Sequence, residues 1–120
     1  MATSPEQMKQ RTKEFALRVI RVCQSLDDGW IGRTMGQQLL RCGTSVGANY
    51  RAACRGRSPA EFRAKMGIVL EEADEAGFWM EMLIESNIVT AARLEGLHKE
   101  ASELVAIAVS SLNTSRRSTR

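Results

Sequence analysis

Two serine-proline steps constrain the fold more than any other feature of this sequence, because each marks the start of a helix. The chain has only two prolines, Pro5 and Pro59, and both follow a serine. Ser4-Pro5-Glu6-Gln7 and Ser58-Pro59-Ala60-Glu61 each place a capping serine before the proline and a Gln or Glu three residues after the cap. Serine satisfies free backbone N–H groups, and proline is well tolerated at the first helical position. Two helix starts are therefore predicted.

Apolar residues recur at alternating steps of three and four, which is the spacing of one helix face. The stripes run from Met8 to Leu26, from Ile31 to Ala53, from Phe62 to Leu83 and from Leu94 to Leu112. No alternating run of β-branched residues indicates a strand. We expect four helices, at about residues 5–26, 31–55, 59–86 and 91–113.

Short connections between these helices decide the expected topology. Linkers of three to six residues bring consecutive helices side by side in opposite directions. The sequence therefore predicts an all-α fold, an antiparallel up-down-up-down four-helix bundle, as a single domain over residues 1–120. Of the 120 residues, 43% are hydrophobic, which suffices for one core without a disulfide framework. Residues 114–120 are expected to form a basic, flexible tail.

The apolar and cysteine patterns favour a reducing compartment. The longest apolar run, residues 104–109, is far shorter than the ~20 residues needed to cross a bilayer. The first six residues lack the basic start and apolar stretch of a secretory signal. Cys23, Cys42 and Cys54 are an odd number without C-x-x-C spacing, which favours reduced thiols. We expect a cytoplasmic protein without membrane contacts.

Charge is distributed unevenly along the chain. Residues 1–70 contain twelve Lys or Arg and five Asp or Glu, whereas residues 71–113 contain two and nine. The net charge of +3 therefore hides a basic half joined to an acidic half.

An arginine-bearing face lies opposite the apolar stripe of the helix expected over 31–55. At ~100° per residue, several basic, small or neutral residues fall within about 80° of one another: Arg33, Gln37, Arg41, Thr44, Ala48, Arg51 and Arg55. No acidic residue occurs from Gly29 to Ala60. Guanidinium groups bind phosphate oxygens in pairs, and small spacers allow a close approach. We predict a nucleic-acid-binding face formed by Arg33, Arg41, Arg51 and Arg55, helped by Arg57, Arg63, Arg116 and Arg117.

The helix expected over 59–86 carries an acidic and aromatic face that supports a different prediction. Phe78 lies about 150° from the centre of the apolar stripe, and an outward aromatic suggests a partner surface. The expected oligomer interface consists of Glu71, Asp74, Phe78, Trp79, Glu81 and Glu85. The arginine-bearing helix of a neighbouring subunit could dock there, and such a heterologous contact can close into a ring. The protein would then be an interaction scaffold whose arginines serve subunit or client-protein contacts.

Asn49 occupies a position in the apolar stripe, where its amide needs polar partners. Gln38, Ser45 or Glu72 could supply them from the flanks of the core. We expect these four residues to form a structural polar layer that sets helix register.

No catalytic, metal or cofactor site is predicted. A di-iron bundle needs two Glu-x-x-His motifs and two further glutamates, whereas the chain has one histidine, His98, preceded by Glu95. No Ser-His-Asp or Cys-His set can be assembled convincingly around that single histidine. We therefore expect a protein that is not an enzyme.

The central block of the sequence resembles a known protein family. The run from Gln38 to Ala53, followed by Arg55, Ser58, Glu61, Phe62 and Lys65, resembles the four-helix-bundle proteins encoded in intervening sequences of bacterial 23S rRNA genes. The likeness continues through residues 71–85 and 111–116 and spans roughly residues 10–117. Many members have Ala-Glu-Gly after the asparagine, whereas Asn49 is followed here by Tyr-Arg-Ala.

This resemblance implies a homopentamer with a central channel. The family is similar to accessory proteins of diversity-generating retroelements, which are basic pentameric barrels that bind nucleic acid and a reverse transcriptase. The combined expectation is a non-catalytic, RNA-associated accessory protein that acts as a basic homo-oligomeric ring. Its expected partners are other copies of itself, RNA or DNA through phosphate contacts, and a reverse transcriptase or another protein client.

Overall fold

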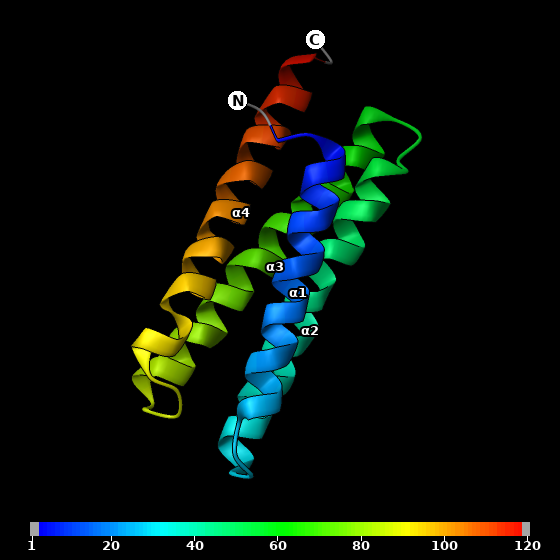
Figure 1. Ribbon diagram of the computed structural model, residues 1–120. Coiled ribbons are helices and arrows are strands. Elements are labelled where there is room, and N and C mark those ends of the chain that lie inside the picture. The colour runs from blue at the N-terminus through cyan, green and yellow to red at the C-terminus, as the bar shows by residue number, and fades with distance from the viewer. Residues whose placement is uncertain (1–2, 119–120) are drawn as a thin grey trace.

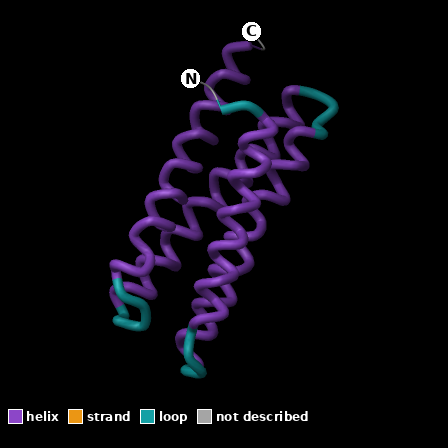
Figure 2. Tube along the Cα trace, viewed as in Figure 1, coloured by secondary structure: helices purple, strands orange, loops and turns teal. Residues whose placement is uncertain are grey.

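The computed structural model describes residues 3–118, which form four long helices and no strand (Figures 1 and 2). The helices are α1 (Pro5–Ser25), α2 (Trp30–Cys54), α3 (Pro59–Glu85) and α4 (Ala91–Ser118). The all-α prediction is confirmed. No described helix is long and apolar enough to cross a membrane.

Both serine-proline steps cap helices as their sequences indicate. The Ser4 hydroxyl accepts a hydrogen bond from the Gln7 N–H at 3.1 Å, and the Gln7 side chain accepts one from the Ser4 N–H at 2.9 Å. The Ser58 hydroxyl accepts from the Glu61 N–H at 3.1 Å and so caps α3, whereas the Glu61 side chain accepts from the Arg57 N–H instead of the Ser58 N–H. The cap bonds, reciprocal in α1 and single in α3, satisfy donors that the first helical turn leaves free.

The last helix is longer than its apolar stripe suggests. It was expected to end near residue 113, but α4 continues to Ser118, so the prediction of a flexible tail was wrong for residues 114–118. Ser115 accepts a hydrogen bond from Arg63 of α3 at 3.3 Å, which ties this last stretch to the bundle. Basic side chains in the final turn also interact favourably with the helix dipole. Residues 119 and 120 of the expected tail lie outside the described residues.

The core consists of the apolar stripes of all four helices. The largest fully buried side chains come from every helix: Met8, Phe15, Val19, Val22, Leu39, Val46, Met66, Val69, Met80, Leu83, Leu94 and Leu104. The result is a rod with extents of 50 × 24 × 21 Å. Helix α2 packs on both α1 and α3, and α3 packs on α4. The contact between α1 and α4 is the least extensive of the four helix pairs.

Glycines let α1 and α2 approach closely. Along α2, successive glycines lie against residues that come progressively earlier in the chain: Gly36 lies against Leu26, just after α1, and Gly43 and Gly47 lie against Val19 and Thr12 of α1. These two helices therefore run in opposite directions, as Figure 1 shows. A Cβ atom at Gly43 would lie 2.8 Å from both γ-carbons of Val19. The absent side chain at this position is therefore a packing requirement.

We expect Gly43→Ala to lower the free energy of unfolding by about 1 kcal/mol. Overpacking against the β-branched Val19 costs about 1–3 kcal/mol, which exceeds the gain of up to ~1 kcal/mol in helix propensity. Gly67→Ala in α3 is the matched control, because a Cβ there meets nothing within 4 Å. That variant should be stabilised by about 0.5–1 kcal/mol. Urea denaturation at one protein concentration measures both, and equal stabilisation by the two substitutions would contradict the close contact.

Candidate nucleic-acid interface

All four arginines predicted for the outer face of α2 are exposed, but only three of them are without a partner among the described residues. Arg33, Arg51 and Arg55 make no side-chain hydrogen bond or ion pair with another described residue. They are distributed along a helix of 25 residues, which is roughly 37 Å long. Their guanidinium groups are therefore available to an anionic partner along most of the bundle.

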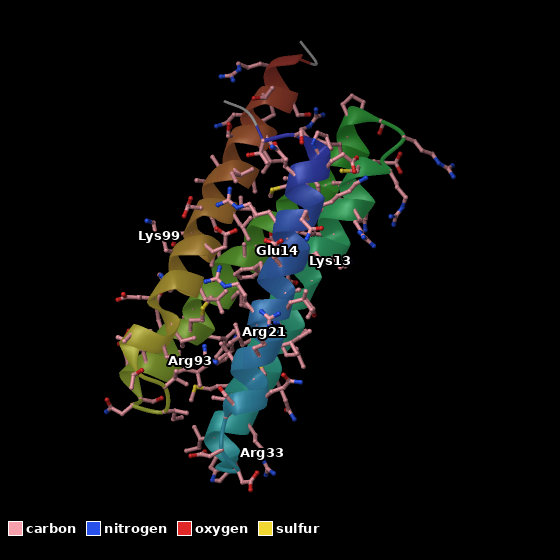
Figure 3. The ribbon with its side chains drawn as sticks, viewed as in Figure 1. Lys13, Glu14, Arg21, Arg33, Arg93 and Lys99 are labelled. Atoms are coloured by element: carbon pink, nitrogen blue, oxygen red, sulfur yellow. The ribbon has the colours of Figure 1, made fainter. Side chains whose placement is uncertain are left out.

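The surroundings of Arg33 differ from those of the other two. It lies at the lower end of the bundle in Figure 3, where Asp27 and Asp28 line the same surface hollow. Trp30, one turn earlier, is 71% exposed and offers an aromatic surface that the sequence analysis did not include. Positive charge is therefore locally offset around Arg33, and the basic character of the face is stronger toward Arg51.

A groove between α1 and α2 extends the basic surface around Arg51. Lys9 and Lys13 of α1 line it together with Arg51, and no carboxylate contributes to its lining. Its remaining lining residues are small or uncharged: Thr12, Ala16, Thr44, Gly47 and Ala48. The groove has a volume of about 280 Å³. Because the other lining residues are small or uncharged, a phosphate backbone could approach all three cationic side chains.

Neither lysine of this groove was predicted from the sequence as a binding residue. Lys9 and Lys13 are four residues apart and lie on one flank of the α1 apolar stripe, so they share a side of that helix. Lys9 also makes an exposed ion pair with Glu6 at 3.6 Å. The ~100° spacing of a helix places the two lysines on one side of α1, but it says nothing about which residues of α2 face them.

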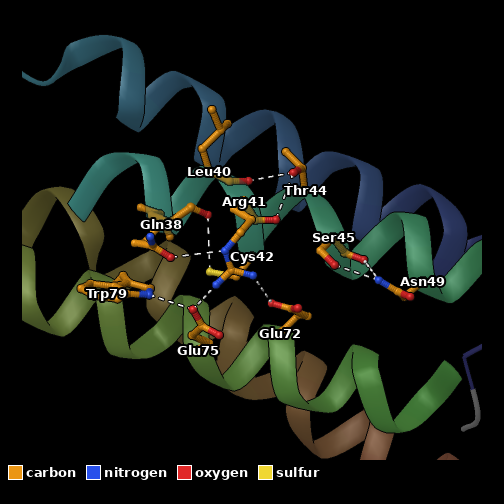
Figure 4. A network of polar contacts seen from close by, with 11 residues as sticks. Gln38, Leu40, Arg41, Cys42, Thr44, Ser45, Asn49, Glu72, Glu75 and Trp79 are labelled. Carbon is orange, nitrogen blue, oxygen red and sulfur yellow. Dashed lines mark hydrogen bonds and ion pairs between the residues drawn. The ribbon is translucent and has the colours of Figure 1, made fainter. Parts of the chain in front are cut away.

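Arg41 differs from the other arginines because α3 supplies its counter-charges (Figure 4). Its guanidinium forms ion pairs with Glu72, at 3.3 Å, and with Glu75. It also donates a hydrogen bond to the side-chain oxygen of Gln38 at 3.3 Å. Trp79 completes the cluster by donating its indole N–H to Glu75 at 3.0 Å. We therefore exclude Arg41 from the candidate phosphate-binding face and assign it to the α2–α3 seam.

The remaining predicted arginines gather at the upper end of the bundle in Figure 1, where the α2–α3 loop and the end of α4 lie. Arg57 is exposed in the loop, and its backbone N–H donates to the Glu61 carboxylate at 2.9 Å. Arg63 is half-buried against α4. Arg116 donates to Asn113 at 3.4 Å, and Arg117 is exposed in the last turn. This end continues the basic surface beyond Arg55.

The predicted acidic and aromatic face is exposed on α3. Phe78 is 49% exposed and Met82, one turn later, is 37% exposed. Phe78 meets the ring of Trp79 edge-on, with ring centroids 5.0 Å apart. The predicted carboxylates Glu71, Asp74, Glu81 and Glu85 are exposed on the same helix. Glu81 is already engaged by His98, whose Nε2 lies 2.8 Å from its carboxylate.

The expected polar layer is divided into two separate clusters rather than one. Asn49 donates to the Ser45 carbonyl at 2.9 Å and to its hydroxyl at 2.8 Å, both within α2 (Figure 4). Gln38 and Glu72 instead bind Arg41. All four side chains are half-buried on the α2–α3 flank, because Asn49 lies at the edge of the apolar stripe rather than at its centre.

Burial suppresses the reactivity of two thiols. Burial in the core raises the pKa of Cys42 to about 12, and partial burial raises the pKa of Cys23. The pKa of Tyr50 is also raised, mainly by burial and secondly by a hydrogen bond with Cys54. Cys23 and Cys42 therefore stay protonated at neutral pH. Among the described residues, no three His, Cys, Asp or Glu side chains come together as a metal site.

These features define a class of protein: a helical bundle with a basic face on α1 and α2 and an acidic, aromatic face on α3. The chain belongs to the 23S rRNA-intervening sequence protein family, whose family model matches residues 6–110. The resemblance noted in the sequence is thereby confirmed. No curated protein matches the chain.

A solved structure supports the same assignment. The chain is similar to a protein of unknown function from the S23 ribosomal protein family of Bacteroides thetaiotaomicron. The two are 32% identical, with a TM-score of 0.84, and the match covers 91% of this chain and 97% of the other.

We expect Arg41→Gln to lower the free energy of unfolding by about 1 kcal/mol, because it leaves two carboxylates of α3 without their counter-charge. The value is modest because the Arg41 side chain is 50% exposed, although that of Glu72 is only 18% exposed. Arg51→Gln is the matched control and should change stability by less than about 0.5 kcal/mol. Chemical denaturation compares them. Equal effects would show that the α2–α3 ion pairs contribute nothing distinctive.

Proposed function

We propose that this protein is a non-catalytic nucleic-acid-binding accessory protein, and that it holds a phosphate backbone along the outer face of α2. One observation carries the proposal. Arg51 lies beside Lys9 and Lys13 in a groove without a lining carboxylate, and Arg55 continues this surface without a described partner. Lys13, Arg51 and Arg55 form no ion pair with another described residue, and cations that their own chain does not neutralise attract a polyanion strongly.

RNA is the nucleic acid to test first, because the family to which the chain belongs is named for the 23S rRNA intervening sequence. The groove offers lysine and arginine side chains that contact phosphate rather than base edges. Binding should therefore depend weakly on sequence and strongly on salt.

We expect affinity for a single-stranded RNA to fall by about two orders of magnitude between 50 and 200 mM salt, as about four or five phosphate contacts would require. Arg51→Glu and Lys13→Glu should each weaken binding by at least tenfold. Lys99→Glu, on the exposed surface of α4, is the matched control and should have a much smaller effect. Fluorescence anisotropy measures all four proteins. Affinity that is independent of salt, or an equal loss in the control, would refute the proposal.

We further propose that the chain assembles into a homo-oligomeric ring, with five subunits as the expected number. The exposed Phe78 and Met82 support a subunit contact, because large apolar side chains gain free energy when a partner covers them. A contact between this α3 face and a different face of the neighbouring subunit is heterologous and can close into a ring. The expected protein client, including a reverse transcriptase, stays a prediction.

Light scattering coupled to size exclusion tests this assembly. The expected native mass is about five times the chain mass of 13.3 kDa. Phe78→Glu should reduce that mass to the monomer while circular dichroism stays helical, because it places a charge in the proposed contact. Arg51→Glu should leave the mass unchanged. If Arg51→Glu instead dissociates the oligomer, the arginines serve subunit contacts and the protein is an interaction scaffold.

A further inference from the structure

A second cationic cluster lies on the other flank of α1, at its seam with α4. Arg18 and Arg21 of α1 and Arg93 of α4 line one small hollow of about 180 Å³, whose other lining residues are Val22 and Leu97. Figure 3 shows Arg21 and Arg93 at the same level of the bundle, on the two helices that form this seam. None of the three arginines lines the α1–α2 groove.

These arginines have no counter-charge in the described part of the chain. No side-chain hydrogen bond or ion pair joins Arg18, Arg21 or Arg93 to another described residue. Like charges gathered around one hollow repel one another. A bound anion would relieve it.

The same seam shows what a neutralised arginine looks like. Arg11 donates to the Glu100 carboxylate at 2.6 and 2.8 Å and to Glu103 at 3.2 Å. The hydrogen bond to Glu100 raises the pKa of Arg11 above its ordinary value. Glu100 and Glu103 are therefore already bound to Arg11. The next acidic side chain on α1, Glu14, accepts a hydrogen bond from Gln10.

Two features of α4 hold the cluster in place. A Cβ atom at Gly96 would lie 3.4 Å from Nη2 of Arg18, so the Arg18 guanidinium crosses the seam and rests close to the α4 backbone. Arg93 lies in the first turn of α4, where its backbone N–H donates to the Thr90 hydroxyl at 3.3 Å. The backbone of Arg93 is therefore anchored, while its side chain lines the hollow.

We propose that Arg18, Arg21 and Arg93 bind a phosphate monoester, as inorganic phosphate or as the terminal phosphate of a nucleic acid. A monoester carries about −1.5 to −2 charges at pH 7 and presents three acceptor oxygens. Three guanidinium groups around one hollow match that charge and geometry, because each can bind phosphate oxygens in a bidentate way. An internal phosphodiester carries a single charge and suits a row of cations better. The site does not depend on the α2 face.

Isothermal titration with inorganic phosphate, at constant ionic strength, tests the proposal directly. We expect one site per chain and at least tenfold weaker binding in Arg21→Gln and Arg93→Gln. Lys99→Gln, on the exposed surface of α4, is the matched control and should bind phosphate like the parent protein. Lowering the pH from 7.5 to 5.5 should weaken binding, because the second phosphate pKa is about 6. No measurable binding, or an equal loss in the control, would overturn the assignment.

Stability measurements keep the test independent of folding defects. Without phosphate, Arg93→Gln should melt at the same temperature as the parent protein or higher, because it relieves repulsion. Arg18→Lys retains the charge but removes the planar fork, so it should also bind phosphate more weakly. If both variants bind phosphate normally, the arginines do not form the site.

Competition with oligonucleotides distinguishes the two sources of the phosphate. A 5′-phosphorylated oligonucleotide that displaces inorganic phosphate at least tenfold better than its 5′-hydroxyl counterpart identifies a nucleic-acid end as the ligand. Failure of both to compete identifies free phosphate. Equal displacement by both oligonucleotides would show binding of internal diesters and would contradict selectivity for a monoester. Arg51→Glu separates this result from the proposed function, because it weakens backbone binding along α2 and lies outside the hollow of Arg18, Arg21 and Arg93.

Discussion

The close packing of α1 against α2 determines which side of α2 faces outward. Gly43 has no room for a methyl group beside the branched side chain of Val19, and a Cβ atom at Gly36 would displace the end of the Leu26 side chain. Once these glycines face α1, the 100° step of the helix places Arg51 and Arg55 on the outside. The basic face is therefore exposed for two reasons: the packing of α1 against α2 turns it outward, and its charged side chains are favourably hydrated.

Arginines on this bundle differ in role because they differ in neighbours. Arg41 and Arg51 belong to the same helix, but only Arg41 lies on the α3 flank, within reach of Glu72 and Glu75. On α1, Arg11 meets two carboxylates of α4, whereas Arg18 rests near Gly96. The capacity of the molecule to bind anions therefore depends less on its net charge than on which arginines have no carboxylate partner within the fold.

Local chemistry made the helices predictable, whereas contacts between helices limited what could be said of the sites. The capping serines and the apolar stripes each act within a few residues, so the helix starts follow from the sequence alone. The helical wheel placed Arg51 outward for the same reason. It gave an angle for Arg41 but not the identity of the facing residue, Glu75, which lies 34 positions away.

The same limit explains the features that sequence reasoning missed. Lys13 and Arg51 share a groove only because α1 and α2 pack at a particular register. Arg21 and Arg93 are even farther apart in the chain, and no periodicity connects them. The end of α4 was misjudged because its apolar stripe stops at Leu112, although hydrogen bonding to Arg63 continues at Ser115.

The two tryptophans occupy contrasting environments, so intrinsic tryptophan fluorescence can report on two different parts of the structure. Trp30 is 71% exposed, so its emission is that of an indole in water in the folded and unfolded chain alike. Trp79 is half-buried and held by Glu75 at the α2–α3 seam. A change in emission wavelength therefore reports separation of those two helices, whereas quenching by a dissolved iodide ion reports chiefly on the indole at the start of α2.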